Sequence, residues 1–249
     1  MPLRKLALPV VLLCLPLFAA AQQPEQTYSR LNTFSAFTEY SNDSTHIILG
    51  TAMNRKIGAL GFQYQRRLVR RRPLDLYYEA EIRPAMLESD PMQHTEDIQT
   101  SPQSDTYNFG PDAVMRCNAW TLAYSQTIAT STGTVVIAGT EIQTCPRRTV
   151  IEQGFAPAGI RINLAPRHRL QLTFSTNAGY MFSTQEVPVP SAGAFNYTFD
   201  FGGGLEYSMS RTRSVRLEYQ VQHFSNKQTA YENPGVDSGF IKLTFGFGR

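Results

Sequence analysis

The chain has 249 residues, a formal net charge of +3 and 17% charged residues, a charged fraction below the roughly 25% of typical soluble domains. Its 15 Phe and 12 Tyr residues favour β structure and are compatible with a membrane environment. The basic residues are spread along the chain, and no Lys/Arg block is interleaved with stacking aromatic residues. This composition argues against a nucleic-acid partner.

The N-terminus has the pattern of an export signal. Arg4 and Lys5 precede an apolar run over 6–18, which leads into three alanines ending at Ala21. This predicts a secretory signal peptide over 1–21, removed by cleavage after Ala21. No later stretch reaches the ~18 to 20 apolar residues that a membrane helix needs. We therefore expect residues 22–249 to form an exported protein without a helical anchor.

Most of the following chain alternates between apolar and polar residues with a period of two. In 74–84 one parity carries Leu74, Leu76 and Tyr78, and the other carries Asp75, Glu79, Glu81 and Arg83. The same alternation recurs in 57–66, 156–164, 168–182, 195–207, 213–225 and 237–247. The region 31–53 is less regular and fits one strand with a bulge, or two strands. These segments predict eight strands, with nine as the alternative.

Two architectures share this alternation and place the apolar face oppositely. A soluble sandwich or lipocalin-like barrel buries its apolar face, whereas an outer-membrane barrel turns it toward lipid. The polar faces carry both signs of charge, as ion pairs filling a narrow lumen would require, although the outer face of a soluble sheet is also charged. These residues are Glu79, Glu81, Arg83, Arg161, Asp200, Glu206, Arg216 and Glu218.

The lengths of the connections favour the membrane barrel. Outer-membrane barrels have short periplasmic turns and long outer loops, and the connections alternate in this way. Those at 67–73, 165–168 and 208–212 are short, and those at 85–155, 183–194 and 226–236 are longer. The final stretch, "IKLTFGFGR", resembles the aromatic last strand of such proteins, although it ends in Arg249. We predict an all-β, eight-stranded antiparallel outer-membrane β-barrel with an elaborated extracellular loop.

The segment 86–155 is predicted to form that loop, with room for a small hairpin built from "NAWTLAYSQTI" and "GTVVIAGTEI". It contains Cys117 and Cys145, the two cysteines that remain once Cys14 leaves with the signal peptide. In an oxidising compartment such a pair favours a disulfide over a metal or catalytic site. We expect this disulfide to staple the loop.

A possible reactive group lies at the end of the strand predicted over 213–225. His223 and Ser225 are two residues apart, so their side chains share the face of Val221 at a separation of about 7 Å along the strand. Hairpin pairing would place Asp237 beside His223, which brings together a nucleophile, a base and an orienting acid. The alternative is that His223 is an interfacial residue where the strand leaves the membrane. An outward-facing site would suit a substrate whose acyl chains already lie in the membrane.

The motif "HFSN", followed by "NPGVD" and an aromatic last strand, resembles the C-terminal motif of the lipid A 3-O-deacylase family, the PagL-like acyloxyacyl hydrolases. The resemblance is specific over about 213–247, and the insertion lies outside it. It implies a location in the bacterial outer membrane, with Ser225 as nucleophile, His223 as general base and Asp237 as the acid. It also implies that Asn226 serves the oxyanion hole, with Asn233 matching a second loop asparagine.

The chain departs from that family pattern in two places. Asp237 stands where the family has a glutamate, so the acid is one methylene shorter. The stretch 227–229, Lys-Gln-Thr, replaces a smaller one that contains glycine, which leaves open which backbone group would serve an oxyanion.

Other polar residues give weaker signals. His94 lies near Glu96 and Asp97 but without the ligand spacing of a metal site. His46 and His168 are interpreted as bulge and turn residues. The glycines at 202–204 lie within a strand and begin no helix, so they do not form a phosphate loop. We expect neither a metal nor a cofactor.

The sequence thus predicts an esterase that removes an ester-linked acyl chain from lipid A or a similar glycolipid by a Ser-His-acid mechanism. One alternative is a non-catalytic outer-membrane barrel of structural or adhesion type that keeps the motif for packing. Another is a secreted soluble β-barrel that binds a small apolar ligand.

Overall fold

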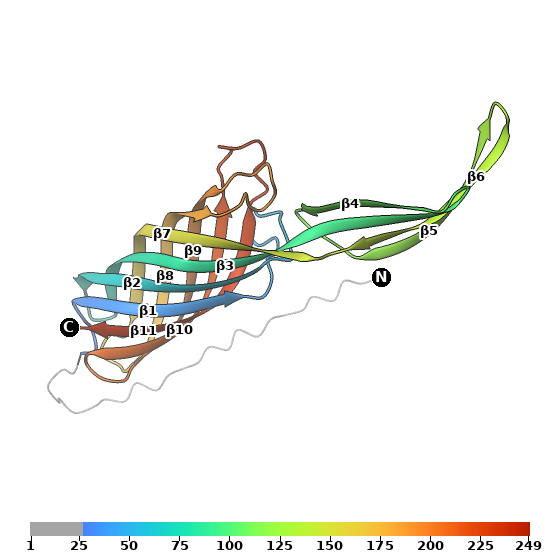
Figure 1. Ribbon diagram of the computed structural model, residues 1–249. Coiled ribbons are helices and arrows are strands. Elements are labelled where there is room, and N and C mark those ends of the chain that lie inside the picture. Colours follow the sequence, from blue (N-terminus) through green and yellow to red (C-terminus); the bar gives the residue numbers. More distant parts are fainter. Residues whose placement is uncertain (1–26) are drawn as a thin grey trace, which may run out of the picture.

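The computed structural model describes residues 27–249, so the predicted signal peptide lies outside the described part. Eight strands form a closed antiparallel barrel (Figure 1), in which β11 pairs with β1. They are β1 (Asn32–Ser41), β2 (Lys56–Arg70), β3 (Leu74–Ser101), β7 (Arg147–Leu164), β8 (Leu170–Ser183), β9 (Phe195–Ser208), β10 (Arg213–Ser225) and β11 (Val236–Gly248). The eight-stranded prediction is confirmed, and the region 31–53 provides one strand followed by a loop. Within residues 27–249, no helix could cross a bilayer.

The barrel wall has polar side chains inside and apolar side chains outside. In β10, Arg216 and Glu218 are buried, whereas Leu217 and Tyr219 are 55% and 56% exposed. The exposed large hydrophobic residues continue around the wall on the outward parity of the other strands. This arrangement is that of a barrel whose outer surface faces lipid, as predicted for an outer-membrane barrel, and it is the reverse of a soluble barrel.

The lumen is filled by ion pairs. The Nε of Arg161 lies 2.6 Å from Glu79 and its Nη1 lies 3.0 Å from Glu218. The Nε of Arg83 lies 2.7 Å from Glu39, and its Nη2 lies 2.7 Å from Asp200. Buried charges are tolerated when each is paired in this way.

One end of the barrel carries the longer loops and is called the outer end below. An apolar cluster of Ile57, Met86, Met181, Phe224 and Phe240, with five smaller members, fills the barrel beneath these loops. Met86 reaches it because the pairing of β3 with β7 shifts between Arg83 and Met86. This bulge changes the inward parity of β3 from odd to even, so Met86, Glu88 and Asp90 are buried.

Two barrel strands continue beyond the outer end and carry the insertion. β3 pairs with β7 as far as Pro91 and Arg147, so the projecting part covers 92–146 and is shorter than the predicted 86–155. There β4 (Asp105–Ala113), β6 (Gly133–Thr144) and β5 (Trp120–Thr130) join the end of β3 in the order β4-β3-β6-β5. This projecting sheet extends far from the barrel (Figure 1). It contains the predicted hairpin, as β5 and β6, and the predicted disulfide between Cys117 and Cys145.

Candidate active site

His223 and Ser225 lie at the outer end of β10, on the parity that faces outward. Each is partly exposed. The neighbouring strands place Asp237 of β11 opposite His223, and Tyr197 of β9 opposite Ser225. The polar pair therefore interrupts a lipid-facing surface.

The structure brings His223 and Asp237 into direct contact. The Nδ1 of His223 lies 2.6 Å from the Oδ1 of Asp237. The Asp237 side chain is fully buried, whereas that of His223 is 17% exposed. Because the two residues are directly paired across the strands, the short aspartate side chain spans the gap. Nε2 is then the ring nitrogen left for a reacting group.

Ser225 lies two residues beyond His223 on the same face. Its hydroxyl makes no hydrogen bond with any side chain or backbone group in the described residues. Catalytic hydrogen bonds often form fully only in the substrate complex. The structure thus places all three predicted residues on one patch and joins two of them.

Asp237 is held by a second set of contacts that the sequence did not reveal. Its Oδ2 accepts the backbone N–H groups of Ile47 at 3.0 Å, Ile48 at 2.5 Å, Leu49 at 2.9 Å and Gly50 at 2.9 Å. These four N–H groups are called the amide clamp below. They stabilise the negative charge of the carboxylate and leave Oδ1 for His223. Backbone groups carry no side-chain signature, which is why the motif could not indicate them.

The amide clamp belongs to the β1–β2 loop, residues 42–55. This loop lies along the outer end of β11 and forms β-bridges with it, from Ser44 to Ser238 and from Ala52 to Val236. Its close approach requires Gly50, because a Cβ there would lie 2.4 Å from the backbone nitrogen of Asp237. Gly235 has a φ of 61°, and its Cβ position lies 3.1 Å from the His223 ring. Both glycines thus give the His223–Asp237 pair its close packing.

Asn226 braces the outer loops. Its buried Nδ2 donates to the carbonyls of Ala192 and Glu232, each at 2.5 Å, and its Oδ1 accepts from the backbone N–H of Gln228 at 2.8 Å. Both hydrogens of the side-chain amide are therefore used by loop carbonyls. Asn233 is exposed on the same loop. Within residues 27–249, neither side chain is hydrogen-bonded to His223 or Ser225.

The chain turns sharply directly after Asn226. The backbone N–H of Thr229 donates to the Asn226 carbonyl at 3.1 Å. Lys227 and Gln228 have φ values of 54° and 63°, which makes this a type I′ turn. The conformation is one that glycine usually adopts, although no glycine is present. Lys227 places its Nζ 5.8 Å from the centre of the Tyr197 ring, on the Ser225 side of the site.

Aromatic side chains form a continuous outward-facing group beside Ser225. Neighbouring ring centres lie between 5.0 and 6.0 Å apart along the series Phe155, Tyr180, Phe182, Phe195 and Tyr197. Membrane barrels carry such aromatic girdles at the level of the lipid headgroups. This aromatic group lies at the outer end of the barrel wall, where Tyr197 pairs with Ser225.

The remaining polar candidates are not part of the group formed by His223, Ser225 and Asp237. His94, Glu96 and Asp97 are in the projecting sheet, and His168 is in the turn before β8. His46 belongs to the β1–β2 loop, where its Nδ1 lies 2.8 Å from the Gly50 carbonyl. Among the described residues, no group of three or more His, Cys, Asp or Glu side chains could hold a metal ion.

The fold and the site define an outer-membrane β-barrel with a serine, a histidine and an aspartate on its lipid-facing wall. The family model of lipid A 3-O-deacylase (PagL) matches residues 103–247, more than half of the chain. The chain therefore belongs to this family. The match includes most of the projecting sheet, so the prediction that the insertion lies outside the resemblance was wrong.

Comparisons with individual proteins are less informative. No curated protein sequence matches the chain. Among solved structures, Neisserial surface protein A is similar with a TM-score of 0.43 at 8% identity, over 88% of this chain and 97% of that one. An outer-membrane channel from Pseudomonas putida F1 has a TM-score of 0.28 at 9% identity, over 92% and 99% of the two chains.

Proposed function

We propose that this protein is an outer-membrane serine esterase that removes an ester-linked acyl chain from lipid A. The observation that carries the proposal is the contact between His223 and Asp237 beside Ser225, on the wall that faces lipid. Membership of the lipid A 3-O-deacylase family supports the same substrate. A soluble binding protein would have no reason to place this polar trio on an apolar outer face.

The geometry supports a two-step ester hydrolysis. Nε2 of His223 takes the proton of Ser225 as its Oγ attacks the acyl carbonyl, and Asp237 holds the ring with Nδ1–H toward Oδ1. The tetrahedral intermediate collapses, the C–O bond to the lipid breaks, and His223 returns the proton to the leaving hydroxyl. Water then attacks the acyl-enzyme with His223 again as base, which releases the fatty acid and restores Ser225.

The negative oxygen of the intermediate needs hydrogen-bond donors. We propose that these are the backbone N–H groups of Asn226 and Lys227, since the side-chain amide of Asn226 is used by the loops and the N–H of Gln228 is bonded to Asn226 Oδ1. In this proposal Asn226 shapes the oxyanion hole by fixing the turn, and Asn233 is available to the sugar or phosphate part of the substrate.

The direct test is the mass spectrum of lipid A after incubation with the purified protein in membranes. The wild type is expected to remove one acyl chain, and Ser225→Ala and His223→Ala to remove none at a measurable rate. Ser125→Ala, on β5, and His168→Ala, in the turn before β8, are controls expected to retain the wild-type rate. Undiminished deacylation by both site variants would contradict the proposal.

Labelling with a fluorophosphonate separates the enzyme from a non-catalytic barrel that keeps the motif for packing. An activated Ser225 is expected to be labelled in the wild type and not in Ser225→Ala or His223→Ala. A wild type that stays unlabelled and leaves lipid A intact would favour the structural role.

A further inference from the structure

Arg55 ties the end of the β1–β2 loop to several separate segments. The side chain is fully buried, and it forms ion pairs with Glu88 at 3.3 Å and Asp90 at 3.2 Å on β3. Its guanidinium donates to four carbonyls, those of Met53 at 2.9 Å, Met115 at 3.0 Å, Val114 at 3.0 Å and Pro188 at 2.9 Å. One side chain thus joins the loop that carries the amide clamp to the barrel wall, to the β8–β9 loop and to the insertion.

The contact with the insertion involves its base, defined here as residues 113–118. The Met115 carbonyl accepts hydrogen bonds from both Arg55 and the backbone N–H of Met53, the latter at 2.8 Å. The loop that holds Asp237 on one side is therefore held on its other side by the insertion base.

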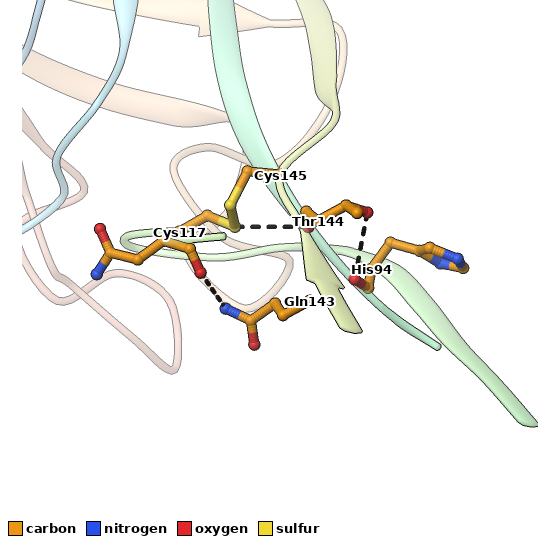
Figure 2. The surroundings of a disulfide bond; sticks show 6 residues. His94, Cys117, Gln143, Thr144 and Cys145 are labelled. Carbon is orange, nitrogen blue, oxygen red and sulfur yellow. Dashed lines mark hydrogen bonds between the residues drawn. A yellow bond between two sulfur atoms is a disulfide. The ribbon is translucent and has the colours of Figure 1, made fainter. Parts of the chain in front are cut away.

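The insertion base is in turn tied to the end of β6, just before the chain enters β7 of the barrel wall. Cys117 forms the disulfide with Cys145, which directly follows β6 and precedes β7. Figure 2 shows a second link beside it, where the Nε2 of Gln143 donates to the Asn118 carbonyl at 2.7 Å. These links hold the base beside the point where the chain passes from the projecting sheet into β7.

We infer that the insertion base positions the acid of the site: through Arg55 and Met53 it fixes the β1–β2 loop, whose amide clamp orients Asp237 toward His223. This inference rests on the proposed function and adds a role for the insertion, with Arg55 as a positioning residue. The clamp occupies Oδ2 with four donors, which leaves Oδ1 as the one oxygen directed at the ring. Misplacement of a catalytic group by about 1 Å lowers rates by about 10²-fold.

A double-mutant cycle tests whether Arg55 acts through Asp237. In the otherwise wild-type protein, Arg55→Gln is expected to lower kcat for deacylation about 10- to 100-fold. In an Asp237→Ala background no carboxylate remains to be oriented, so the same substitution is expected to change kcat less than about threefold. Arg30→Gln is the matched control, because Arg30 is a buried arginine at the opposite end of the barrel. It is expected to leave kcat within about twofold in both backgrounds.

A second variant covers the case in which Arg55→Gln fails to fold. Gly50→Ala keeps every donor of the amide clamp but forces the loop away from β11, because the added Cβ would lie 2.4 Å from the Asp237 nitrogen. Gly50→Ala is expected to lower kcat about as much as Arg55→Gln does in the otherwise wild-type protein. Like Arg55→Gln, it is expected to have little effect on kcat in the Asp237→Ala background. A folded barrel migrates differently on a gel before and after heating, and this difference verifies that each variant is folded.

The disulfide gives a third readout. Replacing Cys117 and Cys145 together by serine is expected to lower kcat less than Arg55→Gln does, because the Gln143 contact remains.

The possible results separate this role from the function on which it rests. A wild type that leaves lipid A intact, or an active Ser225→Ala, refutes the proposed function and with it the role of the insertion base. If the wild type is active and a folded Arg55→Gln or Gly50→Ala variant lowers kcat equally with Asp237 present and with Asp237→Ala, the positioning role alone is refuted. A folded Arg55→Gln or Gly50→Ala variant that deacylates at the wild-type rate also refutes the positioning role.

Discussion

Replacing Asp237 by asparagine tests the site most sharply, because the structure dictates how the amide must sit. An NH₂ group in the position of Oδ2 would face the four N–H donors of the amide clamp. The amide oxygen must therefore occupy that position, and the NH₂ must point at Nδ1 of His223. Nδ1 then becomes an acceptor, and the ring proton moves to Nε2, where it blocks removal of the Ser225 proton.

The expected loss of kcat is large, and the asparagine variant is expected to lose more activity than the alanine variant. A carboxylate-to-amide change that imposes the wrong histidine tautomer lowers kcat about 10⁴-fold in the well-studied serine protease triad, which corresponds to about 5.5 kcal/mol of transition-state stabilisation. Asp237→Ala imposes no tautomer, so its loss is expected to be smaller, about 10²-fold. The alanine variant should thus be more active than the asparagine variant, although it leaves the clamp donors without an acceptor and is less stable.

Initial rates of fatty-acid release, measured by mass spectrometry at a fixed ratio of substrate to detergent, give the order of activity. Urea unfolding of the same samples gives the order of stability. Asparagine and alanine variants with equal rates, or an asparagine variant within tenfold of the wild type, would refute the reasoning about the tautomer.

Two further predictions concern stability, both measured by urea unfolding in detergent micelles. Gln228→Gly removes the side chain of a residue whose backbone is in the left-handed region, and it is expected to raise the free energy of unfolding by about 1 kcal/mol. The exposed control Tyr231→Gly should give no gain, and equal effects would contradict a strained turn. Arg161→Met leaves Glu79 and Glu218 buried without this partner and is expected to lower the free energy of unfolding by about 3 to 5 kcal/mol. The exposed Arg213→Met should change it by less than about 0.5 kcal/mol, and a similarly small effect of Arg161→Met would show that the pair is dispensable.

The barrel could be predicted because its determinants are local. A period of two along each strand fixes which residues share a face, and charges of both signs on one face indicate a filled lumen. The same logic failed at the insertion boundary. The alternation of β3 breaks at the bulge between Arg83 and Met86, so the strand was predicted to end at 84, where it continues with shifted parity. The disulfide followed from cysteine number and compartment alone.

The support of the site was harder to predict for a different reason. The amide clamp consists of backbone groups, and the contacts of Arg55 join segments that are far apart in the sequence. The motif indicated that Asn226 lies beside Ser225, but not that its amide bonds to loop carbonyls. Residue types at a motif therefore indicated the candidate trio, whereas the groups that hold it depend on the packing of loops.

The outward direction of His223 and Ser225 has a kinetic consequence. An enzyme whose site opens sideways into a bilayer meets its substrate by lateral diffusion, in two dimensions. The mole fraction of substrate in the surrounding lipid then governs the rate of encounter, and the bulk concentration does not. Inert detergent added at constant total substrate should slow such an enzyme in proportion to the dilution of the membrane surface.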